Sequence, residues 1–79
     1  MELKFNVVKS EPGSIVIHIS DGEQKIGKLN IIGNYAKILL DRKLLPLNNF
    51  PDTYKTIMGT HNNLLEGKLL DVIYEEGAL

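Results

Sequence analysis

GNYAKILLDRKLLP, residues 33–46, is the most apolar continuous stretch in the first two-thirds of the chain. It has two interpretations. As a helix, it would be capped by Asn34 and stopped by Pro46. As strands, residues 35–40 would pair with the segment before them, and residues 44–47 would return as a short edge strand, where a proline is tolerated. We favour strands, because the Gly-Asn pair at the start of the stretch continues a series of hairpin turns.

Three segments before this stretch alternate apolar and polar residues, which is typical of half-buried strands. The turns between them are marked by Pro12-Gly13 and Asp21-Gly22, two pairs that favour tight reversals of the chain. Gly27 interrupts the alternation in the third segment and predicts a β-bulge. The three segments span residues 2–9, 15–20 and 24–32.

After the central stretch, Pro51 suits the first turn of a short helix near residues 51–58. Residues 68–74 form a nearly continuous apolar run, which predicts a strand buried on both faces. The 79 residues support a single small domain, residues 1–79. We therefore expect a mainly β fold, a small partly open barrel of five or six strands with one short helix. The alternative is an α+β fold, a three-stranded antiparallel meander with helices on one face.

Three local patterns carry a resemblance to a known group of domains. They are GNYAKILL from Gly33, the Leu-Leu-Pro that follows it, and LEGKLLDV at residues 65–72. They resemble strands of small SH3-like barrels of unknown function from low-GC bacteria. The resemblance covers residues 31–47 and 64–74, and it implies a barrel but no site residues. The chain departs from that pattern by an extra N-terminal hairpin and by an insertion at residues 48–63.

The composition argues against several kinds of chemistry. There is no cysteine, and the two histidines, His18 and His61, lie far apart in the sequence, so we expect no metal site and no cofactor. No nucleophile motif surrounds any serine or threonine, and we expect no enzymatic activity. The N-terminus does not resemble a signal peptide, and no apolar run is long enough to span a bilayer. We expect a cytoplasmic protein without a membrane partner. The Lys, Ile and Asn bias fits a low-GC bacterium or one of its phages.

Charge is distributed unevenly, although the net charge is only −1. Residues 23–43 are basic and residues 66–79 are acidic, which would suit an acidic partner or head-to-tail association of two copies. The candidate partner-binding residues are Lys25, Lys28, Tyr35, Lys37, Arg42 and Lys43. Phe50 and Tyr54 are expected to form a cap or a secondary interface.

These residues predict a non-enzymatic protein-binding or regulatory module, of the kind found in small accessory or phage-encoded proteins, and a homodimer is compatible with it. The alternative is a single-stranded nucleic-acid-binding barrel that uses the basic segment at residues 25–43 and Tyr35. A third, weaker interpretation is a small-ligand fold closed by a cap at residues 50–58. The sequence does not identify the partner or the biological process.

Overall fold

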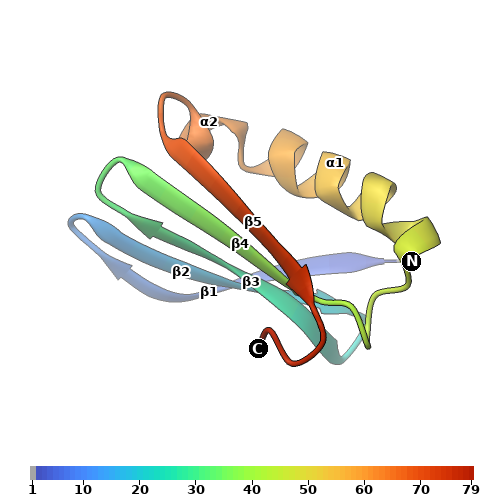
Figure 1. Cartoon of the computed structure of the whole chain (residues 1–79). Helices are drawn as coiled ribbons and strands as arrows, with labels where there is room; N and C mark the ends of the chain where they lie inside the picture. Colours follow the sequence, from blue (N-terminus) through green and yellow to red (C-terminus); the bar gives the residue numbers. More distant parts are fainter. Residues whose placement is uncertain (1) are drawn as a thin grey trace.

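Four consecutive strands form an antiparallel meander, and a fifth strand joins the sheet after a helical segment (Figure 1). This arrangement comes from a computed structural model, which describes residues 2–79. The elements are β1 (Leu3–Glu11), β2 (Ser14–Asp21), β3 (Gln24–Ile32), β4 (Tyr35–Asp41), the 3₁₀ turn η1 (Leu47–Asn49), α1 (Phe50–Thr60), α2 (Asn62–Leu65) and β5 (Leu69–Glu75).

The mainly β prediction is confirmed, but the barrel is not. The strand order is β1-β2-β3-β4-β5, so β1 and β5 lie at opposite ends of an open sheet. β5 runs parallel to β4, because α1 and α2 carry the chain back to the end of the sheet where β4 begins. A parallel neighbour of β4 occupies the edge of the sheet and does not reach β1. The helices do pack on one face, as in the α+β alternative, but the meander has four strands instead of three.

The first half of the central stretch is a strand, as predicted. Its alternation directs Ala36, Ile38 and Leu40 toward the helices, and each is 0% exposed. The predicted return strand at residues 44–47 is wrong. The backbone N–H groups of residues 44 and 45 both donate to the Asp41 carbonyl oxygen, at 3.0 and 2.9 Å, and this tight turn drops the buried Leu45 side chain into the core.

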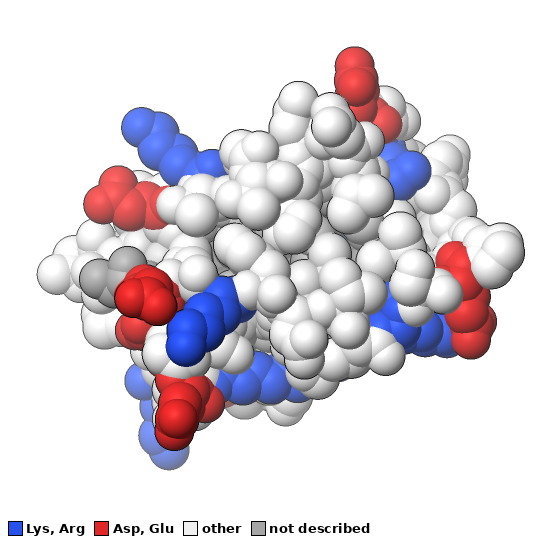
Figure 2. Space-filling view, turned by 180° about the vertical axis from the view of Figure 1, so that it is seen from behind, with Lys and Arg blue, Asp and Glu red and all other residues white. Residues whose placement is uncertain are grey.

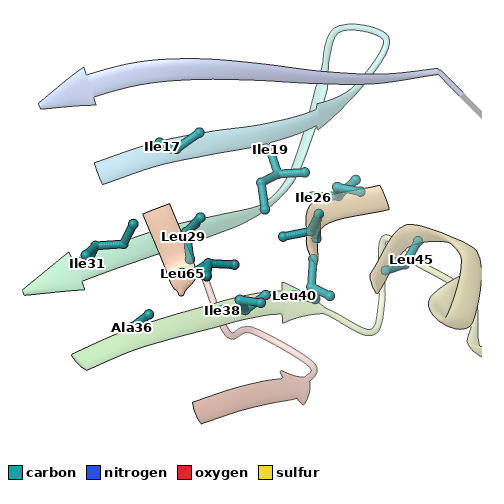
Figure 3. Packing of buried hydrophobic residues seen from close by; sticks show 11 residues of the cluster. Ile17, Ile19, Ile26, Leu29, Ile31, Ala36, Ile38, Leu40, Leu45 and Leu65 are labelled. Atoms are coloured by element: carbon teal, nitrogen blue, oxygen red, sulfur yellow. The ribbon is translucent and has the colours of Figure 1, made fainter. Parts of the chain in front are cut away.

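The core lies between the helix-side face of the sheet and the helices (Figure 3). β2, β3 and β4 supply most of it, Ile57 comes from α1, and Leu65 comes from α2. The predicted helix is confirmed as α1, with Pro51 in its first turn. The buried hydrophobic residues are Ile17, Ile19, Ile26, Leu29, Ile31, Ala36, Ile38, Leu40, Leu45, Ile57 and Leu65.

The bulge predicted at Gly27 is present. Ile19 pairs with Gly27, Ser20 pairs with Lys25, and Ile26 is the extra residue between them. The insertion changes which residue parity faces the helices, so both Ile26 and Leu29 are buried. The structure also explains why a glycine stands here, since a Cβ at residue 27 would lie 2.4 Å from the carbonyl oxygen of Leu39 on β4.

β5 differs from its prediction because it is an edge strand. Its helix-side residues Val72 and Tyr74 are half-buried, whereas Leu69 is 68% exposed. The Tyr74 hydroxyl donates to the Leu45 carbonyl oxygen, and its ring packs against Phe50 at a centroid distance of 4.5 Å. Tyr74 therefore ties β5 both to the turn after β4 and to α1. Within residues 2–79, no helix is long and apolar enough to span a membrane.

Candidate functional site

The face of the sheet opposite the helices has no layer of described residues packed on it (Figure 1). We call this surface the open face. Strand register arranges its side chains in rows that cross β2, β3, β4 and β5. The three central rows are His18, Lys28, Leu39 and Ile73; Val16, Asn30, Lys37 and Asp71; and Ser14, Ile32, Tyr35 and Leu69.

The open face brings together four of the six predicted partner-binding residues. Lys28, Tyr35 and Lys37 lie in the central rows, and Lys25 lies beyond them, opposite Ser20 on β2. His18 is the direct cross-strand neighbour of Lys28. Partial burial, together with the charges of Lys25 and Lys28, lowers the pKa of His18 below its usual value. His18, Lys25 and Lys28 therefore interact electrostatically as one cluster.

The other predicted residues lie elsewhere. Arg42 and Lys43 are exposed in the turn after β4, where the Arg42 N–H donates to the Glu75 carbonyl oxygen at 3.1 Å. Phe50 and Tyr54 are on the helix side of the sheet, half-buried, and their rings stack with centroids 6.0 Å apart. These four side chains do not contribute to the open face.

Tyr35 is held by a neighbouring strand. Its hydroxyl donates to Oδ2 of Asp71 on β5 at 3.0 Å. This hydrogen bond is the main cause of a raised pKa for the Tyr35 hydroxyl, with smaller effects from desolvation and from the Asp71 charge. The bond connects β4 to β5 across the open face and fixes the Tyr35 ring in one orientation.

Apolar residues between the cations were missed as site residues. Val16, Leu39 and Ile73 are half-buried in the central rows, and Ile32 is 62% exposed. Period-two alternation could have assigned Val16 to this face. Ile73 could not have been assigned to it, because the placement of β5 beside β4 leaves no local signal in the sequence.

A polar atom on this face also lacks a partner. The side-chain oxygen Oδ1 of Asn30 is buried and accepts no hydrogen bond from residues 2–79. Asn30 lies in the middle row, between Val16 and Lys37. Because buried polar atoms are normally satisfied, this oxygen is an exception within the sheet.

The aromatic residues are divided unequally between the two sides of the sheet. Of the five in the sequence, Tyr35 is the one on the open face. Phe5 contacts His61 edge to face at 4.6 Å, and Phe50 packs against Tyr54 and Tyr74, all on the helix side. The open face therefore offers lysines and aliphatic side chains, with one anchored aromatic ring.

The two histidines are also separated by the sheet. His18 belongs to the open face, and His61 lies between α1 and α2, where its ring meets Phe5. Among residues 2–79, no group of three or more His, Asp and Glu side chains is arranged to hold a metal ion.

Comparison of the chain with family models, curated proteins and solved structures gives no significant match. The resemblance to small SH3-like barrels therefore stays an expectation drawn from residues 31–47 and 64–74. Function is inferred below from the chemistry of the open face.

Proposed function

We propose that this chain is a non-enzymatic protein-binding module, cytoplasmic, whose open face holds an acidic and partly apolar surface of a larger protein. The observation that carries the proposal is the composition of that face. Aliphatic side chains alternate with Lys25, Lys28 and Lys37 on a sheet surface that no other described part of the chain covers. Protein interfaces commonly combine apolar contacts with complementary charges on the two partners.

Charge determines the kind of partner. On β2, β3 and β4, the open-face side chains include Lys25, Lys28 and Lys37 but a single acid, Asp41. Oδ1 of Asp41 accepts the Lys43 N–H at 2.9 Å, and the side chain is largely buried, so it is turned away from a partner. Acidic groups on the partner would pair with the lysines.

A single-stranded nucleic acid is the second candidate ligand, and the gathering of three lysines with Tyr35 on one face favours it. Such proteins stack successive bases on several aromatic rings. Here one ring is present on the open face, and its hydroxyl is bound to Asp71. Aliphatic side chains fill the positions where stacking would be needed, which is why we favour a protein.

The proposal of no catalysis rests on shape and on residue type. The open face is a sheet surface that does not enclose a substrate. A hollow of about 330 Å³ lies beside α1 and is lined by Leu3, Asn49, Asp52, Thr53 and Thr56. Asp52 is the one titratable residue in that lining, so a general acid–base pair has no second member there.

The proposal is tested by affinity capture from a bacterial cytoplasmic lysate, with and without nuclease. The test variant of the tagged chain replaces Lys25, Lys28 and Lys37 with Glu. The matched control replaces Lys43, Lys55 and Lys68 with Glu and so changes the net charge equally. We expect the wild-type chain to capture one or a few proteins whose bands survive nuclease treatment. These bands should disappear with the test variant and persist with the control.

Binding of a fluorescent oligothymidylate separates the two candidate ligands. A nucleic-acid module would bind this probe, with an affinity that falls steeply as salt rises and a salt slope that shrinks in the Lys25, Lys28 and Lys37 variant. That result, or loss of the captured bands on nuclease treatment, would contradict the protein-binding proposal. Circular dichroism confirms that each variant is folded before its binding is compared.

A further inference from the structure

We propose that two copies of this chain pair antiparallel along the free edges of their β1 strands and form one continuous ten-stranded sheet. The occupant of this edge is a second copy, and the inference does not depend on what binds the open face. It rests on the exposure of β1, on the uncharged surface beside it and on the charges that a two-fold arrangement places opposite each other.

β1 is the last strand of the sheet at one end, so one of its two edges has no strand neighbour. It is nine residues long and carries apolar side chains in its middle, where Val7 is 57% exposed and Val8 is 47% exposed. A long edge strand with exposed valines is a ready template for pairing with another strand.

The surface beside this edge is uncharged at its centre. Figure 2 shows the molecule from behind, the side on which β1 lies in Figure 1, and its charged side chains are confined to the margins. Phe5 of β1 is only partly buried, and its ring meets His61 of the helix layer. An uncharged area that continues from the strand edge onto the helix layer is typical of a protein interface.

The β-bulge in β1 sets the register. Val7 pairs with Ile17 and Lys9 pairs with Val16, so Val8 is an extra residue. Before the bulge, odd-numbered residues face the helices, and after it they face the open side. Paired residues must point to the same face of a sheet. Residues on opposite sides of the bulge can therefore pair only when their numbers add to an odd value.

One such register matches the charges. When Val7 lies opposite Val8 of the second copy, Lys4 lies opposite Glu11 of the second copy, and symmetry repeats both contacts. A shift by two residues places Lys4 opposite Lys9 of the second copy, which is repulsive. Within the chain, Lys9 Nζ already lies 3.9 Å from Glu11 Oε2, so the Lys4 contact adds a second cation to the same carboxylate.

The symmetry has a structural consequence. The two-fold axis of an antiparallel pair of this kind is perpendicular to the sheet, so both helix layers lie on one side and both open faces lie on the other. The dimer would present one surface twice as wide as the open face of a single chain. A partner with two acidic segments could then be held at two points.

Sedimentation equilibrium from low micromolar to several hundred micromolar chain tests the proposal. We expect the wild-type chain to reach twice the monomer mass within this range. Lys4→Glu would place like charges opposite each other at two symmetric positions and weaken the dimer at least about tenfold. The double variant Lys4→Glu with Glu11→Lys would restore opposite charges, with a dimer dissociation constant within about threefold of wild type. Lys55→Glu on α1 serves as the control and should leave the dimer unchanged.

Hydrogen exchange gives an independent readout. The amides of residues 3–11 should become slower to exchange as concentration rises, and those of β5 should not change. A monomer at every concentration would overturn the proposal. So would a dimer that the Lys4→Glu variant leaves as tight as the control does, or protection that rises on β5 and not on β1.

Discussion

Gly27→Ala should be among the most destabilising single-methyl additions in this protein. The backbone of Gly27 is not in the left-handed region, so the restriction is one of space. A Cβ at this position would lie 2.4 Å from the Leu39 carbonyl oxygen and 2.6 Å from Cδ2 of Leu40. The leucine side chain can rotate away. The carbonyl oxygen belongs to β4, which pairs with β3 at this point, so it can move only with the strand.

The expected loss of stability depends on the contact with the Leu39 carbonyl oxygen, because the Leu40 side chain can move and the strand backbone cannot. Adding a methyl group to a packed interior costs about 1–3 kcal/mol, and a contact with backbone belongs at the upper end. We expect a loss of about 3 kcal/mol, which corresponds to a fall in Tm of about 12–24 °C for a domain of this size. Gly59→Ala is the matched control. Gly59 is exposed in α1 with nothing within 4 Å of its Cβ position, and alanine should stabilise the helix by about 0.5 kcal/mol.

Urea unfolding followed by circular dichroism compares the two variants with the wild-type chain. The same chemical change is expected to have opposite signs at the two positions, with an unchanged dependence on urea. If Gly27→Ala unfolds within about 0.5 kcal/mol of wild type, the close approach of β3 to β4 at the bulge is incorrect. A destabilised Gly59→Ala would instead show that α1 is not an exposed, regular helix at that residue.

Three further predictions concern the helix layer. Partial burial lowers the pKa of His61 below its unfolded value of about 6.5. The contribution of His61 to stability is therefore complete above that pH and is lost as the pH falls toward the folded pKa. His61→Phe should flatten the fall in unfolding free energy between about pH 7.5 and about pH 5. Tyr74→Phe removes the hydrogen bond to the Leu45 carbonyl oxygen and should lower the unfolding free energy by about 1 kcal/mol, whereas an unchanged urea midpoint would contradict that bond. Ile57 is 0% exposed, and Ile57→Ala should cost about 3–4 kcal/mol in the same assay; a loss below about 1 kcal/mol would mean that α1 does not close the core.

The meander could be predicted from the sequence because its signals are local. Alternation over five or six residues and a glycine-containing pair mark each strand and each turn, and the four antiparallel strands follow one another directly. Gly22 and Gly33 do adopt positive φ values, of 62° and 58°, in the turns where hairpins were expected. Ambiguity over residues 33–46 arose because leucine and lysine favour helices as isolated residues. Pairing with β3 on one side and β5 on the other decides for a strand.

The barrel could not have been corrected from the sequence. Closure depends on where β5 lies, and that depends on the path of α1, a relation between residues some thirty positions apart. The motif around residues 65–72 specifies a strand, but it does not specify a neighbour. Leu44 and Leu45 show a similar limit. Two adjacent leucines resemble part of a strand, yet the first is exposed in a turn while the second fills the core.

The candidate site was predictable to the extent that strand parity was. Tyr35, Lys37 and Leu39 lie two positions apart on β4 and therefore share a face. Lys28 of β3 is on the same face because it pairs with Leu39. Lys25 reaches the same face only because the bulge inserts Ile26. Arg42 and Lys43 were grouped with them by sequence proximity alone, and the turn after β4 separates them from the sheet surface.

The basic segment at residues 23–43 and the acidic segment at residues 66–79 lie next to each other in the folded chain. As sequence segments, they suggested that two copies could meet head to tail. In the sheet, β5 lies directly beside β4, so Asp71 lies opposite Lys37 and accepts a hydrogen bond from the Tyr35 hydroxyl. Part of the acidic segment is therefore matched within the same chain, whereas Lys25 and Lys28 have no acid opposite them in the register. For the open face this favours an acidic partner over a second copy, and for self-association it leaves the free edge of β1, with its exposed valines, as the better surface.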